Sequence, residues 1–129
     1  MATTRRAQKK ANHPRRGEIY LTSLDPTLGH EIRKTRPALI IQNDVSNRLS
    51  EITILAPITS TVRFPLNPVH VLIAANAITG LSVTSVALLN QVRAVDRIRL
   101  IKRLGVVDRA TLDQVDEAIR ISLGLVDLT

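Results

Sequence analysis

The chain of 129 residues predicts one small domain of the mainly β (α+β) class: a strongly bent sheet or compact β-barrel with short helices and a C-terminal α-helix. Two observations carry this prediction. Short apolar or alternating segments recur at close spacing between turn residues, which is typical of strands in a small barrel. Near the end of the chain, the apolar spacing changes to that of a helix. Aromatic residues make up only 2% of the chain, so the core must be aliphatic.

The first two expected strands flank a long loop. Residues 18–24 alternate apolar and polar side chains over most of their length, as a half-buried strand does. Residues 25–35 contain proline and glycine and leave no room for a helix, so we expect a long exposed loop, which is often functional. Pro37 opens the continuous apolar run 38–41, which predicts a strand buried on both faces.

Four further strands are expected in the centre of the chain. They cover residues 52–58, 69–73, 85–89 and 91–95. Pro57 lacks a backbone N–H, so it marks an edge or a bulge in the first of these strands. A polar end formed by Thr59 and Ser60 follows the same strand.

Two helices are expected in the last third of the chain. Asp96 is a good N-cap residue, which predicts a short helix over residues 97–103 that ends at Gly105. Asp108 caps a longer helix that ends at Gly124. The apolar positions of this second helix recur at helical spacing and are Leu112, Val115, Ala118, Ile119 and Leu123.

The formal net charge of +7 is concentrated at the N-terminus. Six of the 18 Lys and Arg residues lie in residues 1–16, and the other 12 nearly balance the 11 acidic residues. We therefore expect residues 1–15 to form a disordered basic arm and residues 16–129 to form the folded domain. The arm would attract phosphate without reading sequence, or it is only a solvated leader.

Several classes of function lack support. The chain has no cysteine, and none of its apolar runs approaches the roughly 20 residues of a membrane span. Its five glycines form neither a phosphate-binding loop nor a dinucleotide fingerprint. The three histidines lack metal-ligand spacing, so no metal or other cofactor is expected. A cytoplasmic protein is the simplest interpretation.

A series of short motifs gives a more specific signal. They are Arg16-Gly17-Glu18-Ile19-Tyr20, Leu24-Asp25-Pro26, Gly29-His30-Glu31, Thr35-Arg36-Pro37, Pro57-Ile58-Thr59-Ser60 and the segment 90–100. In these motifs and their order, the chain resembles the MazF/PemK/Kid family of toxin endoribonucleases from about residue 16 to residue 125. The resemblance implies an SH3-like barrel of the CcdB/PemK-like toxin fold. It also implies a homodimeric mRNA interferase that inhibits growth and a MazE-like antitoxin that covers the RNA groove.

The family resemblance also implies a reaction. The 2′-OH of single-stranded RNA attacks the phosphorus, leaving a 2′,3′-cyclic phosphate and a 5′-OH without a metal ion. Arg36 matches the residue that stabilises charge on the pentacoordinate phosphorus, although an arbitrary arginine would more often pair with Glu31 or Asp25. Thr59 matches the catalytic hydroxyl, which could instead only cap a turn. Ser60 is a weaker neighbour with the same ambiguity.

The proton acceptor is left open between two residues. His30 has suitable chemistry near neutral pH, but family members can carry serine at this position. Glu31 matches the acidic loop residue more consistently, although an exposed glutamate is more often only solvated. The arginine and aspartate that some Kid-like members use are replaced by Leu88 and Asn90, so that catalytic pair does not transfer.

Further RNA-binding residues are less specific predictions. Gln91 and Arg93 suit contacts to base edges and phosphate, with structural hydrogen bonding as an equal alternative. Tyr20 could stack on a base, but a single aromatic on a strand is more often part of the core. His70 is expected to be structural or to face solvent.

Two other functions fit this fold. A barrel that binds RNA or protein without catalysis is possible, but the presence of both Arg36 and Thr59 argues against it. A CcdB-like gyrase poison requires a C-terminal tail containing tryptophan, and this chain has no Trp.

Overall fold

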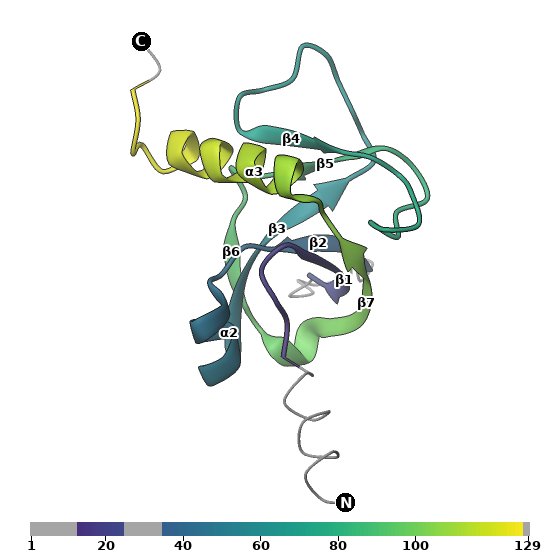
Figure 1. Ribbon diagram of the computed structural model, residues 1–129, viewed down its shortest axis with the longest axis vertical. Helices are drawn as coiled ribbons and strands as arrows, with labels where there is room; N and C mark the ends of the chain where they lie inside the picture. Colours follow the sequence, from purple (N-terminus) through teal and green to yellow (C-terminus); the bar gives the residue numbers. More distant parts are fainter. Residues whose placement is uncertain (1–12, 25–34, 128–129) are drawn as a thin grey trace, which may run out of the picture.

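A computed structural model describes residues 13–24 and 35–127 of the chain (Figure 1). The elements follow in the order β1 Glu18–Ser23, β2 Thr35–Ile40, α2 Asp44–Leu49, β3 Ile52–Thr59, β4 His70–Ile73, β5 Ser85–Leu88, β6 Arg93–Asp96, η1 Arg97–Arg99, β7 Leu100–Val106 and α3 Arg109–Ser122. The predicted loop 25–35 lies outside the described residues except for Thr35, which begins β2. The first twelve residues of the basic arm also lie outside them.

The strands form one bent antiparallel sheet. Its order is β4-β5-β3-β2-β1-β7, and β6 pairs with β3 beside this path. Among the described residues no ladder joins β4 to β7, so the sheet is barrel-like but open. The predicted mainly β class is therefore confirmed, with α3 lying beside β4 and β5 at one end of the molecule (Figure 1).

Strand β3 changes partners along its length. Its first half pairs with β6 through residues 52–55, and its end pairs with β5 at Ile58 and Thr59. Ile54 O accepts a hydrogen bond from Ile41 N, so even-numbered residues of β3 direct their backbone groups toward β2. Pro57 thus faces the gap between the β6 and β5 ladders, where no N–H is needed. This is why a proline is tolerated in a central strand rather than at an edge.

Two clusters of buried side chains lie on the two faces of the sheet. The main core cluster comprises Ile19, Leu39, Ala56, Ile58, Val71, Ile73, Leu81, Ala87, Leu89, Val107, Val115 and Ala118. The second core cluster comprises Leu24, Ala38, Ile40, Leu55 and Val95. Strand β2 contributes to both, which confirms the prediction of a strand buried on both faces.

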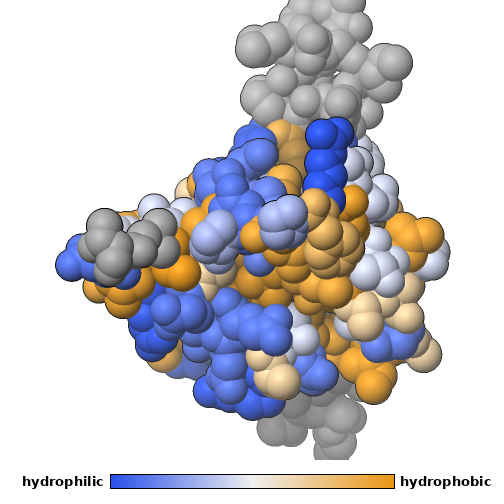
Figure 2. Space-filling view, turned by 90° about the horizontal axis from the view of Figure 1, so that it is seen from above, coloured by the Kyte–Doolittle hydropathy of each residue, from blue (hydrophilic) through white to orange (hydrophobic). Residues whose placement is uncertain are grey.

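Helix α3 covers the main core cluster as its periodicity predicts. Val115 and Ala118 are buried, but Leu123 is 63% exposed because the helix ends before it. Arg16 fastens the helix to the sheet: its guanidinium pairs with Asp116 and donates from Nε to Ile41 O at 2.8 Å. The end of the molecule that carries α3 has hydrophobic areas between hydrophilic ones (Figure 2).

Helix α2 was not anticipated from the sequence. Asn43 caps it, accepting a hydrogen bond from Ser46 N at 2.8 Å. Asn47 is fully buried, and its Oδ1 accepts from Thr53 Oγ1 at 2.7 Å and from Gln42 Nε2 at 2.9 Å. Since both neighbours satisfy the buried amide, this six-residue helix is fixed to β3 by polar rather than apolar contacts.

The predicted helix over residues 97–103 is wrong. Asp96 does cap a turn, accepting from Ile98 N at 3.0 Å, but the turn is a 3-10 helix of three residues. From Leu100 onward the chain forms β7 and pairs with β1. Pairing with the edge of β1 outweighs the local capping signal, because it satisfies backbone groups along the whole segment.

Gly105 does not end a helix; it allows two backbones to meet. A Cβ atom at Gly105 would overlap Ile78 O and Thr79 O, and one at Gly80 would overlap Leu104 O. Val106 N also donates to Ile78 O at 2.9 Å. The connection between β4 and β5 therefore lies directly against β7.

The cap of α3 gives the fold a predicted acid dependence. Hydrogen bonds from Thr111, first from its side chain and then from its backbone, lower the pKa of Asp108 below 3.8. The lowered folded-state pKa means that ionised Asp108 stabilises the fold above the unfolded-state pKa, and that this contribution disappears as pH falls through the folded-state pKa. Asp108→Asn keeps a cap acceptor without a charge, so its free energy of unfolding should fall less steeply with acid.

Urea unfolding from about pH 2 to 6 checks this prediction. Thr111→Val removes the side-chain hydroxyl but keeps the backbone N–H, and should give an intermediate pH dependence. An Asp108→Asn profile parallel to that of the wild type would contradict the assignment.

Candidate active site

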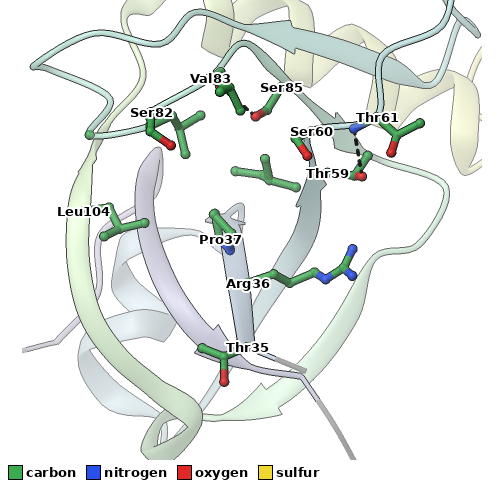
Figure 3. A pocket seen from close by; sticks show the side chains of 13 residues that line it. Thr35, Arg36, Pro37, Thr59, Ser60, Thr61, Ser82, Val83, Ser85 and Leu104 are labelled. Carbon is green, nitrogen blue, oxygen red and sulfur yellow. Dashed lines mark hydrogen bonds between the residues drawn. The ribbon is translucent and has the colours of Figure 1, made fainter. Parts of the chain in front are cut away.

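The register of β2 and β3 brings Arg36 and Thr59 to facing positions on neighbouring strands. Ala38 pairs with Pro57, and extending this register by two residues on each strand places Arg36 opposite Thr59. Leu39 and Ile58 point into the main core cluster, so Arg36 and Thr59 share the opposite face of the sheet. We call this face the Arg36 face. Figure 3 shows both side chains on the same side of the strand pair.

A pocket of about 460 Å³ lies beside this pair (Figure 3). Its apolar wall includes Pro37, Ile58, Leu81, Val83 and Leu104, and its hydroxyl groups come from Thr35, Ser60, Thr61, Ser82 and Ser85. Arg36 and Thr59 also line it. The pocket thus joins a cation and several hydroxyl groups to an apolar surface, a combination that suits a phosphate next to a base.

The Arg36 guanidinium is available for a ligand. The side chain is half-buried, and among the described residues no carboxylate pairs with it. Its alternative partners Asp25 and Glu31 lie outside the described residues. The planar guanidinium offers paired N–H donors that match two phosphate oxygens.

The Thr59 hydroxyl can serve both roles expected of it. Its Oγ1 accepts a hydrogen bond from Thr61 N at 3.2 Å, which closes the turn after β3. Because a hydroxyl has one donor in addition to its lone pairs, the Thr59 O–H stays free to donate to a phosphate oxygen. The turn orients the hydroxyl for that contact.

The other predicted site residues are spread more widely. Ser60 is exposed and lines the pocket next to Thr59. Gln91 is exposed in the turn between β5 and β6, where its N–H donates to Leu88 O. Arg93 begins β6 opposite Leu55 and is half-buried on the Arg36 face. His30 and Glu31 lie outside the described residues.

Tyr20 lies away from the pocket. It packs against the second core cluster, and burial, followed by the charge of Glu18, raises the pKa of its hydroxyl. The side chain also lines a smaller pocket with Pro14 and Arg97. The core position that the sequence allowed for Tyr20 is therefore present, and RNA contact stays a prediction.

The wall formed by Ser82, Val83 and Leu104 was not found from the sequence. These residues reach the pocket because the β4–β5 connection contacts β7 through Gly80 and Gly105. The two glycines are the only sequence signal for that contact, and a glycine alone does not specify its partner.

Two kinds of feature are absent from the described residues. No group of three His, Asp or Glu side chains in this part of the chain lies close enough to hold a metal ion. No helix within residues 13–24 and 35–127 is both long and apolar enough to cross a membrane.

Comparison with known proteins assigns the family. A family model described as "PemK-like, MazF-like toxin of type II toxin-antitoxin system" matches residues 15–123. The chain belongs to this family. The match includes both strands that carry Arg36 and Thr59 and ends one residue after α3.

Members of the PemK/MazF family with assigned names resemble the chain over nearly its whole length. Endoribonuclease EndoA of Bacillus subtilis is 42% identical over 113 residues, covering 88% of this chain and 97% of EndoA. Endoribonuclease MazF of Staphylococcus epidermidis is 40% identical over 111 residues, covering 86% of this chain and 92% of that protein.

Solved structures of the PemK/MazF family share the fold. The MazE–MazF crystal structure (Form-II) from Deinococcus radiodurans contains a chain with a TM-score of 0.73 and 26% identity, covering 88% of this chain and 97% of that one. The barrel-like fold expected from the motifs is thus the fold of solved MazF toxins.

Proposed function

We propose that this chain is the toxin of a type II toxin–antitoxin system and a sequence-specific, metal-independent endoribonuclease of single-stranded mRNA. The observation that carries the proposal is the register of β2 and β3, which sets Arg36 opposite Thr59 beside the pocket. Family membership supports it, because relatives at 40–42% identity are named endoribonucleases.

The reaction proposed is an internal transesterification. The 2′-OH gives its proton to a base, for which Glu31 and His30 are the candidates, and O2′ forms a bond to phosphorus. Arg36 binds nonbridging oxygens as charge accumulates, and Thr59 donates its O–H to one of them. The bond from phosphorus to O5′ then breaks and O5′ takes up a proton. The products are a 2′,3′-cyclic phosphate and a 5′-OH.

Substrate and partners follow from the same site. We propose that Ser60, Gln91 and Arg93 contact the RNA around the scissile phosphate, and that Tyr20 contacts it at a distance from that phosphate. The matching Deinococcus radiodurans crystal structure is one of MazE–MazF. By analogy, this chain forms a cytoplasmic homodimer whose RNA groove is covered by a MazE-like antitoxin.

Cleavage of a long RNA in the presence of EDTA tests the proposal. The purified protein should cut at a short recurring sequence and leave 5′-OH ends, which accept a phosphate from polynucleotide kinase without prior phosphatase treatment. The matching 3′ ends should be cyclic phosphates, which resist a ligase that needs a 3′-OH until they are opened and the phosphate is removed. RNA binding without cleavage would favour a non-catalytic binding barrel, and cleavage that requires Mg²⁺ would contradict the metal-independent route.

A further inference from the structure

The Arg36 face continues beyond Thr59 onto two more strands. Strands β3, β5 and β4 run side by side in the sheet (Figure 1). Thr59 pairs with Val86, so Leu88 lies two positions further along β5, in the row of Pro57. Leu88 in turn pairs with His70 on β4. The register therefore aligns Thr59, Leu88 and His70 in a diagonal across three strands.

Burial confirms which way these side chains point. Val71 and Ile73 of β4 enter the main core cluster, as does Ala87 of β5. Their neighbours His70 and Leu88 must therefore point to the Arg36 face, and both are only half-buried there. His70 and Leu88 are thus accessible on the surface that holds Arg36 and Thr59.

The start of β4 fixes the position of His70 without using its imidazole. The backbone N of His70 donates to Asn67 O at 2.9 Å, and Val69 N donates to Asn67 Oδ1 at 3.0 Å. Leu89 N donates to Val69 O at 2.9 Å. Among the described residues no side chain or backbone group hydrogen-bonds to the imidazole itself. The backbone of His70 is therefore fixed, while the N–H donor of its ring stays uncommitted.

The separation between His70 and Thr59 suits a second phosphate. Two strand spacings and a shift of two residues give a separation of about 12 Å. This separation spans a few nucleotides of a single strand. Leu88 lies between the two positions and offers an apolar surface to an intervening base.

We propose that His70 is an RNA-binding residue that donates a hydrogen bond to a phosphate a few nucleotides from the scissile bond. Leu88 forms the apolar shelf beneath the base between them. The inference rests on the proposed function and extends it: the substrate must be longer than the dinucleotide that reacts. His70 is a positioning residue, since it contacts the substrate outside the reacting phosphate.

Three variants test the proposal: His70→Ala, His70→Lys and the control His13→Ala, which changes a histidine of the N-terminal segment. Cleavage rates are measured at limiting and saturating RNA in EDTA, with thermal unfolding in parallel. His70→Ala should lower kcat/KM about five- to tenfold through KM, with kcat, cleavage sites and Tm unchanged. His70→Lys restores a phosphate donor and should recover kcat/KM, and His13→Ala should match the wild type.

RNA length supplies an independent check. Shortening the RNA past the phosphate bound by His70 should lower kcat/KM of the wild type by the same factor as the His70→Ala substitution does. Once that phosphate is absent, wild type and His70→Ala should be equal, because the two changes remove one contact. The RNA is shortened separately from its 5′ and 3′ ends to identify the side.

The outcomes separate this inference from the proposed function. A wild type that cuts no RNA contradicts the proposed function itself. If His70→Ala cuts RNA as well as the wild type does, only the role of His70 is overturned. A loss that His70→Lys does not restore, or that comes with a lower Tm or a changed oligomeric state, also overturns it.

Discussion

Arg36→Ala should lower the rate of RNA cleavage about 10²- to 10³-fold, which corresponds to about 3–4 kcal/mol of transition-state stabilisation. The guanidinium faces no carboxylate among the described residues and lies opposite the Thr59 hydroxyl, so its interactions are reserved for the substrate. The charge on the phosphorus oxygens is greatest in the transition state. The loss should therefore fall on kcat more than on KM.

Single-turnover cleavage of a 5′-labelled RNA in EDTA measures this effect. Arg36→Lys keeps the charge but loses the planar fork, and should show an intermediate rate. Arg48→Ala, on the exposed surface of α2, is the matched control and should cleave like the wild type. If Arg36→Ala cleaved RNA at the wild-type rate, Arg36 would not be the catalytic cation.

Gly105→Ala should be strongly destabilising, lowering the free energy of unfolding on the order of 4 kcal/mol. The added methyl group would overlap Ile78 O and Thr79 O, which are backbone atoms that cannot move aside by changing rotamer. Relief requires the β4–β5 connection to leave β7. That movement would break the hydrogen bond from Val106 N to Ile78 O and displace Leu81 of the main core cluster.

Urea unfolding followed by circular dichroism measures this change. Lys102→Ala, at an exposed position of the same strand, should stay within about 0.5 kcal/mol of the wild type. Any folded Gly105→Ala protein should also lose part of the pocket wall contributed by Ser82 and Val83. A Gly105→Ala variant as stable as the wild type would show that the two backbones are not in obligatory contact.

The sequence predicts most of the sheet because local patterns and burial agree there. The alternating run at β1, the apolar run at β2 and the capped helix α3 each appear where expected. Arg36 and Thr59 were predicted as a pair from the family motifs. The register of β2 and β3 explains why the two motifs occur together. Arg36 and Thr59 lie next to the buried parts of their strands, and both point to the Arg36 face.

The errors occur where a distant partner decides the local structure. Residues 100–106 carry a helix-capping signal upstream, but the free edge of β1 draws them into β7. Helix α2 depends on Thr53 and Gln42 to satisfy Asn47, and six residues are too few for a periodic pattern. The position of His70 on the Arg36 face likewise depends on the pairing of β4 with β5. Alternation within one strand cannot predict that pairing.

The contact of the β4–β5 connection with β7 also bears on self-association. Strand β7 ends the sheet, and an unpaired edge can recruit a strand from another molecule. The carbonyl of Ile78 already accepts the hydrogen bond from Val106 N, and the exposed part of β7 carries Lys102 and Arg103. A second copy approaching this edge would meet a covered backbone at one end and the exposed charge of Lys102 at the other. The edge of β7 is therefore poorly suited to pairing with a strand from a second copy.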